Sequence, residues 1–277
     1  MATQRPRVAV VGGGITGAMA ALALSEIADV HVFDQGRRGP GGRASHRAVE
    51  AESGAVVQDD PPIAAGALEF DHGCQFTRAD DPRMKSLIQS WMAQGWVAEW
   101  NGRFGSVGGG GGGKHPPDFF GLPSHGAPVY VGVGGMHTLP RRILSGCSAI
   151  VHRGVRVAGM ERDTSSGLWT LLGVGGEAAF HDSSESTAKA AQAQALTGEP
   201  FAAVVLTDIS SSFGGWHRAS AGVPEAFTSQ VRDRCRIPLF SAMVAFDRPL
   251  GVGLDGFTCA ADGSPLWFAA RSSTARW

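Results

Sequence analysis

Residues 8–45, VAVVGGGITGAMAALALSEIADVHVFDQGRRGPGGRAS, determine the fold that the sequence predicts. The apolar, β-branched run 8–11 is typical of a strand that is buried on both faces. Residues 15–28 contain no proline and are rich in Ala, Leu and Met, which favours a helix packed on a sheet. A second strand is expected at 30–33, ending on Asp34. This order of elements predicts the first strand–helix–strand unit of a parallel sheet.

The glycine turn GGGITG, residues 12–17, has the G-x-G-x-x-G spacing of a dinucleotide-binding site. Gly12 permits the tight turn, Gly14 permits close approach of a pyrophosphate to the helix N-terminus, and Gly17 lets helix and strand approach each other. Asp34 is placed to accept hydrogen bonds from ribose hydroxyls. Because 40 of the 277 residues are glycine, the spacing alone also fits a purely structural turn. The flanking strand, helix and acid favour nucleotide binding.

A second glycine-rich turn, QGRRGPGGR at 35–43, follows Asp34 directly. One interpretation is a solvated basic loop. The other is a phosphate-facing turn, in which Gly41 and Gly42 permit close approach and Arg43 offers its guanidinium to the pyrophosphate. The position directly after a dinucleotide turn favours the second interpretation.

The charge and composition of the chain argue against nucleic-acid-binding and membrane-spanning proteins. A net charge of −1 gives no electrostatic reason to expect nucleic acid or an anionic membrane as a partner. No apolar run approaches 18 residues, so no membrane span is expected. Only seven residues precede the first expected strand, which predicts no signal or transit peptide and a cytoplasmic location.

Cysteine and histidine usage points away from metal chemistry. The four cysteines are far apart and form no C-x-x-C pair, so we expect reduced, mostly packed thiols. The nine histidines form no H-E-x-x-H motif and no His/Cys pair at ligand spacing. We therefore expect no metal site.

The rest of the chain predicts further helices and strands. Asp81 and Pro82 indicate a helix start, and Gly95 its end. Asn101-Gly102 lies between two apolar runs and predicts a type I′ hairpin. Further helices are expected after 136, through Leu144, and at 223–235. Strands are expected at 151–161, 168–172, 240–246 and 265–270, the first two antiparallel around a turn at 163–167.

The run FAAVVLTD, residues 201–208, is a second buried strand and the best candidate for a further parallel strand of the first sheet. Three polar or glycine-rich stretches predict loose excursions or insertions, at 48–68, 108–113 and 181–200.

The joint set of motifs resembles FAD-dependent amine-oxidase-like flavoproteins, and within them most closely the renalase-like branch. The motifs that carry the resemblance are the glycine turn, the acid at 34, GPGGRAS at 39–45, FDHGCQFT at 70–77 and YVGVGGM at 130–136. The segments IPLFSAMVAFDRPL at 237–250 and LWFAARSS at 266–273 fit as well. The acid is usually Glu in this family, whereas this chain has the shorter Asp34.

The resemblance implies an α/β fold, with a Rossmann-like FAD-binding domain interleaved with a mixed-sheet α+β substrate domain. The FAD-binding domain is expected at 1–75 and 150–215, and the substrate domain at 76–149 and 216–277. The implied cofactor contacts come from the two glycine turns, the acid, a backbone position near the adenine and a segment beside the isoalloxazine ring. The corresponding residues are Gly12, Gly14, Ile15, Thr16, Gly17, Asp34, Gln35, Gly42, Arg43, Gly73, Gln75 and Val157.

The function implied by the resemblance is that of an FAD-dependent oxidoreductase. FAD would accept a hydride from an amine or a reduced nicotinamide-type small molecule and pass electrons to dioxygen or another acceptor. The sequence points to no catalytic side chain. One alternative is a truncated, non-catalytic flavoprotein fragment, because relatives continue past the 266–273 segment whereas this chain ends at Trp277. The other alternative is an NAD-linked dehydrogenase, which shares the glycine turn and the acid.

Overall fold

The structure is a computed structural model that describes residues 4–57, 67–107, 128–175, 193–232, 234, 239–248, 251, 253–259 and 266–271. The chain forms two compact units. Unit 1 holds the described residues of Met1–Arg43 and Pro140–Phe240, and unit 2 those of Ala44–Val57, Ile63–Leu139 and Ser241–Trp277. The insertions predicted at 108–113 and over 181–192 lie outside the described residues.

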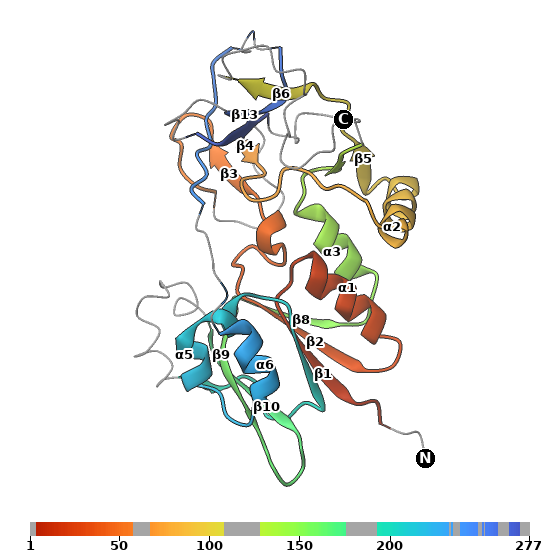
Figure 1. The fold of residues 1–277 in the computed structure, drawn as a ribbon, viewed down its shortest axis with the longest axis vertical. Coiled ribbons are helices and arrows are strands. Elements are labelled where there is room, and N and C mark those ends of the chain that lie inside the picture. Colours follow the sequence, from red (N-terminus) through yellow and green to blue (C-terminus); the bar gives the residue numbers. More distant parts are fainter. Residues whose placement is uncertain are drawn as a thin grey trace. The chain divides into compact units, whose positions relative to one another are not determined.

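Unit 1 is built around a four-stranded parallel sheet in the order β12-β1-β2-β8 (Figure 1). Its strands are β1 (Arg7–Val11), β2 (Asp29–Asp34), β8 (Ile150–Arg153) and β12 (Ala203–Leu206). β1 pairs with β2 and β12, and β2 pairs with β8, all in parallel. The predicted strands at 8–11 and 30–33, and the parallel pairing of the 201–208 run, are confirmed.

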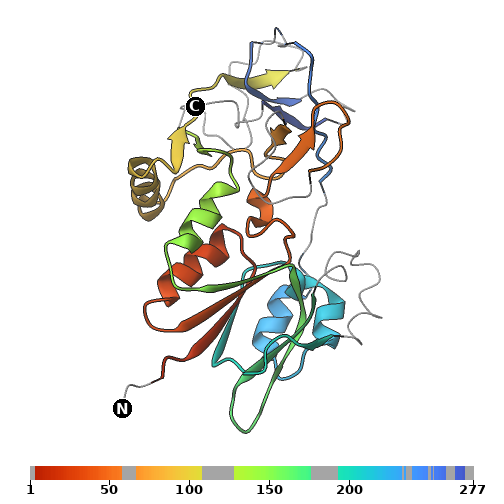
Figure 2. The same ribbon diagram turned by 180° about the vertical axis from the view of Figure 1, so that it is seen from behind.

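Helix α1 (Ile15–Leu24) follows β1 through the glycine turn and packs on one face of this sheet (Figures 1 and 2). Gly12 has φ +102°, a conformation that strongly favours glycine. A Cβ placed on Gly17 would lie 1.8 Å from the Gly12 carbonyl oxygen. Gly17 therefore allows the helix to contact the turn backbone directly, as its spacing predicted.

The opposite face of the sheet carries an antiparallel sheet and short helices (Figure 2). The strands are β9 (Val155–Arg162), β10 (Trp169–Gly175) and β11 (Gln194–Ala195), and the helical segments are η4 (Ser210–Ser212), α5 (Gly214–Arg218) and α6 (Glu225–Val231). The predicted antiparallel pair and its turn are confirmed, since β9 pairs with β10 and Gly167 N–H donates to the Asp163 carbonyl at 2.8 Å. The single strand expected at 151–161 is wrong, because Gly154, with φ +65°, divides it into β8 and β9.

The core between these layers consists of side chains from both sheets and α5. Its buried members are Ala9, Val11, Phe33, Val157, Met160, Leu171, Phe201 and Trp216. Phe33 and Phe201 meet edge to face, with ring centroids 5.9 Å apart. This apolar layer joins strands that lie far apart in the sequence.

The described residues of unit 2 form two two-stranded sheets, a mixed three-stranded sheet and helix α2 (Pro82–Ala93). The pairs are β3 (Arg47–Glu50) with β4 (Ala67–Phe70), and β5 (Val97–Glu99) with β7 (Tyr130–Gly132). The mixed sheet has the order β14-β13-β6, from Phe268–Ala270, Gly256–Cys259 and Phe104–Val107. The 3-10 turn η1 (Gly42–Ala44) and helix α3 (Thr138–Ser145) each include residues of both units.

Helix α2 begins as the sequence predicted. The Asp81 carboxylate accepts a hydrogen bond from the Arg83 N–H at 2.8 Å, and Pro82 occupies the first helical position. Ile88 and Trp91 are its buried residues, and Gly95 follows the helix with φ +68°. The N-cap and the C-terminal glycine are therefore confirmed.

Three sequence expectations require correction. The hairpin around Asn101-Gly102 does not form, because β5 pairs with β7 and β6 pairs with β13 instead. Residues 240–246 form no strand, and Phe240 is fully exposed. The loose excursion expected at 48–68 is wrong at its two ends, because β3 and β4 form an antiparallel pair there. For the hairpin and for the 48–68 stretch, the partner strand rather than the local sequence decides the outcome.

The two compact units group residues 44–57 and 67–75 with unit 2, and residues 140–149 and 216–232 with unit 1. Strand β3 pairs with β4 within unit 2, while α5 packs on β9 and α6 on η4 within unit 1. The division into an FAD-binding domain at 1–75 and 150–215 and a substrate domain at 76–149 and 216–277 stays a prediction.

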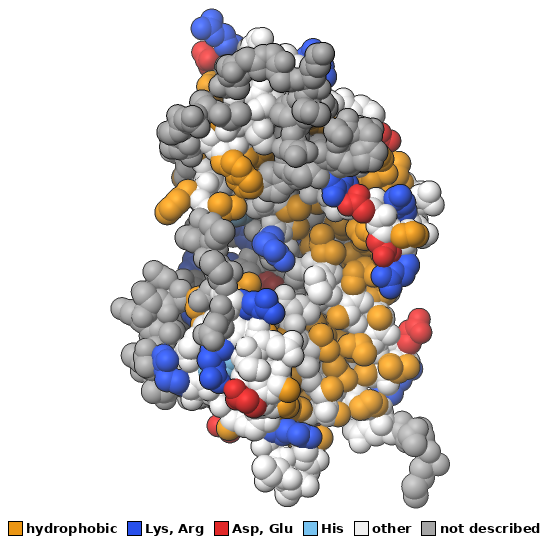
Figure 3. Space-filling model, viewed as in Figure 1, with side chains coloured by type: hydrophobic (Ala, Val, Ile, Leu, Met, Phe, Trp, Pro, Cys, Tyr) orange, Lys and Arg blue, Asp and Glu red, His pale blue; other side chains and the backbone are white. Residues whose placement is uncertain are grey.

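Apolar side chains gather on the outer side of α1 and the turn that follows it (Figure 3). Leu22 is 37% exposed and Ile27 is 67% exposed. None of the helices in the described ranges combines the length and apolar character needed to cross a bilayer.

We expect Gly17→Ala to lower the free energy of unfolding by about 3 kcal/mol or more, because its Cβ would overlap the Gly12 carbonyl. The matched control is Gly175→Ala, since a Cβ at Gly175 has no atom within 4 Å. Urea unfolding of both variants measures the difference. Equal stability of the two variants would show that the helix and turn are not in contact.

Candidate functional site

The candidate site lies at the carboxyl edge of the parallel sheet in unit 1. All four strands run in the same direction, so their carboxyl ends meet at one edge, where ligands of open α/β sheets bind. The glycine turn follows β1, and Asp34 ends β2. The segment after β12 lies beside them, as its contacts with Gly12 show.

Gly12 connects three of the strands. Its N–H donates to the Phe33 carbonyl of β2 at 2.8 Å. A Cβ at Gly12 would lie 2.7 Å from Thr207 Oγ1, and this hydroxyl donates to the Val11 carbonyl at 2.8 Å. The turn is therefore fixed from both neighbouring strands, and a larger residue at position 12 has no room.

The N-terminus of α1 has the features of an anion site. Gly14 is the N-cap and provides no side-chain hydrogen bond, and the first turn contains no acidic residue. The N–H groups of that turn need acceptors from outside the helix. A Cβ at Gly14 would have no contact closer than 3.8 Å, so the glycine leaves open space in front of the helix. This backbone cradle fits a pyrophosphate.

The two predicted glycine turns meet at this point. A Cβ at Gly42 would lie 3.1 Å from the Gly14 Cα, and Gly42 has φ +55°. Gly42 and Arg43 are both exposed. The structure therefore brings the second turn next to the helix N-terminus, where a ligand on the cradle would contact its backbone.

Asp34 is almost fully buried, at 6% exposure. Its Oδ2 accepts a hydrogen bond from the Gly13 N–H at 2.7 Å, and its Oδ1 accepts one from the Gly36 N–H at 2.8 Å. Burial raises the pKa of the carboxyl above its usual value, while these two backbone donors and the nearby charge of Arg141 act in the opposite direction. The carboxylate thus holds the first glycine turn and the start of the second together.

Asp208 is a residue of this edge that the sequence reasoning missed. Its Cβ would lie 3.3 Å from a Cβ at Gly12. The Ser210 hydroxyl donates to its Oδ2, whereas its Oδ1 is buried without a hydrogen-bond partner among the described residues. Burial is the main cause of the raised pKa of this carboxyl. The predicted parallel pairing of 201–208 was the available signal, because the last residues of such a strand lie at the ligand edge.

The remaining predicted residues fall in three places. Ile15 and Thr16 open α1 beside the cradle, and Gln35 is an exposed residue following Asp34. Val157 is 3% exposed and contributes its side chain to the core, in β9. The last two, Gly73 and Gln75, lie in unit 2 on the segment after β4. Among the described residues, no group of three or more His, Cys, Asp or Glu side chains is arranged to hold a metal ion.

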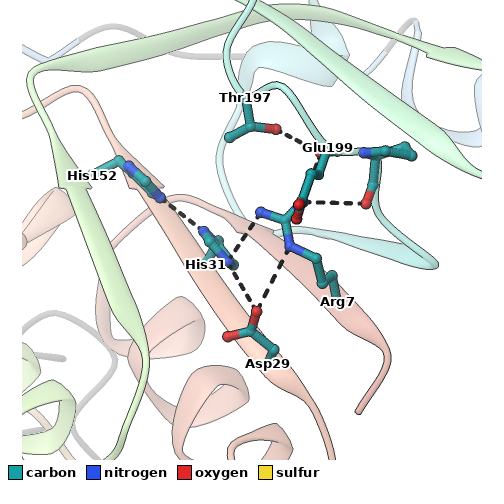
Figure 4. Close-up of polar contacts among 7 residues, drawn as sticks. Arg7, Asp29, His31, His152, Thr197 and Glu199 are labelled. Atoms are coloured by element: carbon teal, nitrogen blue, oxygen red, sulfur yellow. Dashed lines mark hydrogen bonds and ion pairs between the residues drawn. The ribbon is translucent and has the colours of Figure 1, made fainter. Parts of the chain in front are cut away.

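A polar cluster of charged and histidine side chains in unit 1 is a second candidate site (Figure 4). Arg7 forms ion pairs with Asp29, Nε to Oδ2 at 3.7 Å, and with Glu199, Nη1 to Oε2 at 3.2 Å. His31 contacts Asp29 through Nε2 at 3.3 Å and the His152 ring through Nδ1 at 3.0 Å. Arg7 and Asp29 begin β1 and β2, so the cluster starts at the amino edge, opposite to the ligand edge. Its role is to join strands.

Residues 10–91 match the family model of the NAD(P)-binding Rossmann-like domain. The match covers the glycine turn, α1, β2 and the second glycine turn, and it agrees with the Rossmann-like fold of this segment.

Solved structures with a similar arrangement come from several proteins. THI4 of Thermovibrio ammonificans has 12% identity and a TM-score of 0.36, and the match covers 78% of this chain and 61% of that one. A putrescine oxidase with redesigned cofactor binding has 16% identity, a TM-score of 0.38 and coverage of 61% and 55%. A mutant of 2-methyl-3-hydroxypyridine-5-carboxylic acid oxygenase has 16% identity, a TM-score of 0.34 and coverage of 61% and 36%. The chain spans less than two thirds of the length of each of these proteins.

We expect Gly14→Ala to weaken nucleotide binding at least about 10-fold while leaving the thermal unfolding temperature nearly unchanged. The added methyl group has room in the protein but projects into the space in front of the helix N-terminus. Fluorescence titration with FAD or ADP measures affinity, and the wild-type chain is the reference. Unchanged affinity would place the ligand elsewhere.

We expect stability to fall as the pH drops from 7.5 to 5.5. Burial, and then the charges of His31 and Arg7, hold the pKa of His152 below the ordinary value of about 6.5. The unfolded chain therefore takes up a proton at a higher pH than the folded chain, which favours unfolding on acidification.

Replacing His152 with Gln should flatten this pH dependence. Asp163→Asn is the matched control, because its carboxyl has a pKa of about 2 and stays ionised across the window. Thermal unfolding at both pH values measures the slope. An equal slope in the wild-type and His152→Gln chains would assign the effect to another group.

Proposed function

We propose that this chain binds FAD at the carboxyl edge of its parallel sheet and is an oxidoreductase of the amine-oxidase-like type, in the renalase-like branch. The observation that carries the proposal is the meeting of the two glycine turns at the N-terminus of α1, where Gly14 leaves open space and Gly42 lets the second turn come close to it. The Rossmann-like family match over residues 10–91 supports a dinucleotide ligand.

The residues of the edge then have distinct roles. The first-turn N–H groups of α1 bind the pyrophosphate, with Arg43 available from the second turn. Asp34 orients the two turns through Gly13 and Gly36, and its oxygens retain lone pairs with which to accept from the ribose. From the resemblance we propose that the Val157 backbone contacts the adenine, and that the Gly73–Gln75 segment contacts the isoalloxazine ring.

Bound FAD would supply the group that accepts a hydride from an amine or a reduced nicotinamide-type small molecule and passes electrons to dioxygen or another acceptor. The chain itself contributes orientation, hydrogen-bond donors and exclusion of water.

A nicotinamide-linked dehydrogenase is the second candidate. The description of the matching family, an NAD(P)-binding Rossmann-like domain, favours it. The two candidates share the glycine turn and the acid, and they differ in whether the purified protein retains a flavin.

The test is a visible absorption spectrum of the purified chain, recorded before and after incubation with FAD and desalting. We expect a two-banded yellow spectrum that survives desalting and bleaches anaerobically with an amine or a reduced nicotinamide nucleotide. The Gly14→Ala chain is the matched control and should stay colourless. A wild-type chain that stays colourless but binds NADH would favour the dehydrogenase. Retained FAD that no donor reduces would indicate a non-catalytic flavin-binding protein.

A further inference from the structure

Asp208 follows the carboxyl end of β12 and lies beside the first glycine turn. A Cβ on Gly12 would lie 3.3 Å from both the Cβ and the backbone nitrogen of Asp208. The preceding residue, Thr207, donates its hydroxyl to the last carbonyl of β1 at 2.8 Å, and a Cβ on Gly17 would lie 3.0 Å from the same oxygen. Because β1 lies between β12 and β2, Asp208 borders the glycine turn on the side opposite to Asp34.

The two oxygens of the Asp208 carboxyl differ in their hydrogen-bond partners. The Ser210 hydroxyl donates to Oδ2, whereas Oδ1 is buried and has no partner among the described residues. Asp34, in contrast, accepts a backbone N–H on each of its oxygens. A charged oxygen that is buried without a donor is costly, whereas a neutral carboxyl carries a donor of its own. The geometry therefore favours the carboxylate at Asp34 and the neutral acid at Asp208.

The charges around Asp208 leave it close to the neutral form. Burial raises the pKa of its carboxyl more than the hydrogen bonds from Ser210 and from its own backbone, and the charge of Arg156 on β9, lower it. The glycine turn and η4 have no titratable side chain, and α5, which packs on η4, has His217 and Arg218. A pyrophosphate at this edge would add like charge, which raises the pKa of an acid further.

We propose that Asp208 is a positioning residue of the nucleotide site, where it stays protonated and donates a hydrogen bond to an anionic oxygen of the ligand. The proposal rests on the proposed function, and it adds a side-chain donor to the backbone donors of α1. Asp208 as a whole is partly exposed, so a small rotation of the carboxyl brings its unpartnered oxygen to the surface. The ligand then supplies the acceptor that this oxygen lacks within the chain, and nucleotide affinity becomes coupled to one proton.

The test is calorimetric titration of the full chain with ADP-ribose, from about pH 5 to about pH 9. ADP-ribose contains the part that FAD and NAD share, and its pyrophosphate stays ionised throughout this range. We expect the wild-type affinity to fall by up to about 10-fold for each pH unit above the apparent pKa of Asp208, because only the protonated carboxyl can donate.

Asp208→Asn should lose this pH dependence. Its amide donates a hydrogen bond at every pH, while its carbonyl still accepts from Ser210. We expect its affinity for ADP-ribose to lie within about 3-fold of the wild-type value at the acidic end of the range and to exceed it at the alkaline end. Asp208→Ala, which has no donor, should bind about 10-fold more weakly than Asp208→Asn at every pH.

Ser210→Ala should move the pH dependence in a defined direction. The Ser210 hydroxyl lowers the pKa of Asp208, so its removal should shift the loss of affinity to higher pH. Asp163→Asn is the matched control, because the Asp163 carboxyl is exposed, has a pKa of about 2 and lies in the turn between β9 and β10. This control should keep the wild-type pH profile.

The protonation of Asp208 can be measured without a ligand. Carbon-13 NMR of the carboxyl follows its titration in the free chain, and we expect a midpoint above the ordinary value of about 3.8. A midpoint at or below that value would overturn the proposal. So would equal pH profiles of the wild-type and Asp208→Asn chains, a result that leaves the nucleotide site itself intact. A chain that binds no ADP-ribose at any pH would overturn the proposed function, and this proposal with it.

Discussion

The direct contact between helix α1 and the turn that precedes it is the constraint on which the nucleotide edge depends. Gly17 lies so close to the Gly12 carbonyl that no side chain fits between them. This contact sets the direction of the helix, and therefore where its N-terminal N–H groups point. Gly42 can approach Gly14 only because the helix is held in that position. Asp34 then fixes the second turn relative to the first.

The amino and carboxyl edges of the parallel sheet differ in how their positively charged and hydrogen-bond-donating groups are paired. At the amino edge the guanidinium of Arg7 is paired with Asp29 and Glu199 and lies 4.7 Å over the Phe201 ring, so its charge is offset within the protein. At the carboxyl edge, Gly14 leaves backbone donors of α1 without a side-chain cap, and the exposed Arg43 adds positive charge. The first arrangement joins strands, and the second presents donors to an anionic ligand.

The local sequence predicted the structure correctly wherever a turn or a helix cap depends on residues close together in the chain. The glycine turn, the Asp81 N-cap and the turn ending at Gly167 formed as expected, because each depends on neighbours within a few residues. The Asn101-Gly102 hairpin failed because β5 and β6 each found a partner distant in the sequence. Gly154 divided one expected strand, residues 151–161, between two sheets, an outcome that depends on where those sheets lie.

The residues of the candidate site show the same division between features set by the local sequence and features set by the tertiary structure. Position and spacing identified Gly12, Gly14 and Asp34, yet the hydrogen bonds of the Asp34 carboxylate with Gly13 and Gly36 depend on how the two turns fold together. Asp208 was missed because only the tertiary structure brings the end of the 201–208 run beside Gly12. Site residues that come from segments far apart in the sequence have no fixed spacing by which they could be recognised.

The pairing of β1 with β12 joins Val8 to Ala203, across most of the chain. Such a non-local pair makes the first sheet slow to complete, because loop closure must precede the contact. During synthesis at roughly 5–20 residues per second, one side of β1 stays unpaired for about 10–40 seconds after it is made. The strand that precedes the glycine turn is therefore an open hydrogen-bonding edge in the nascent chain, and it stays exposed to pairing with other chains until β12 is made.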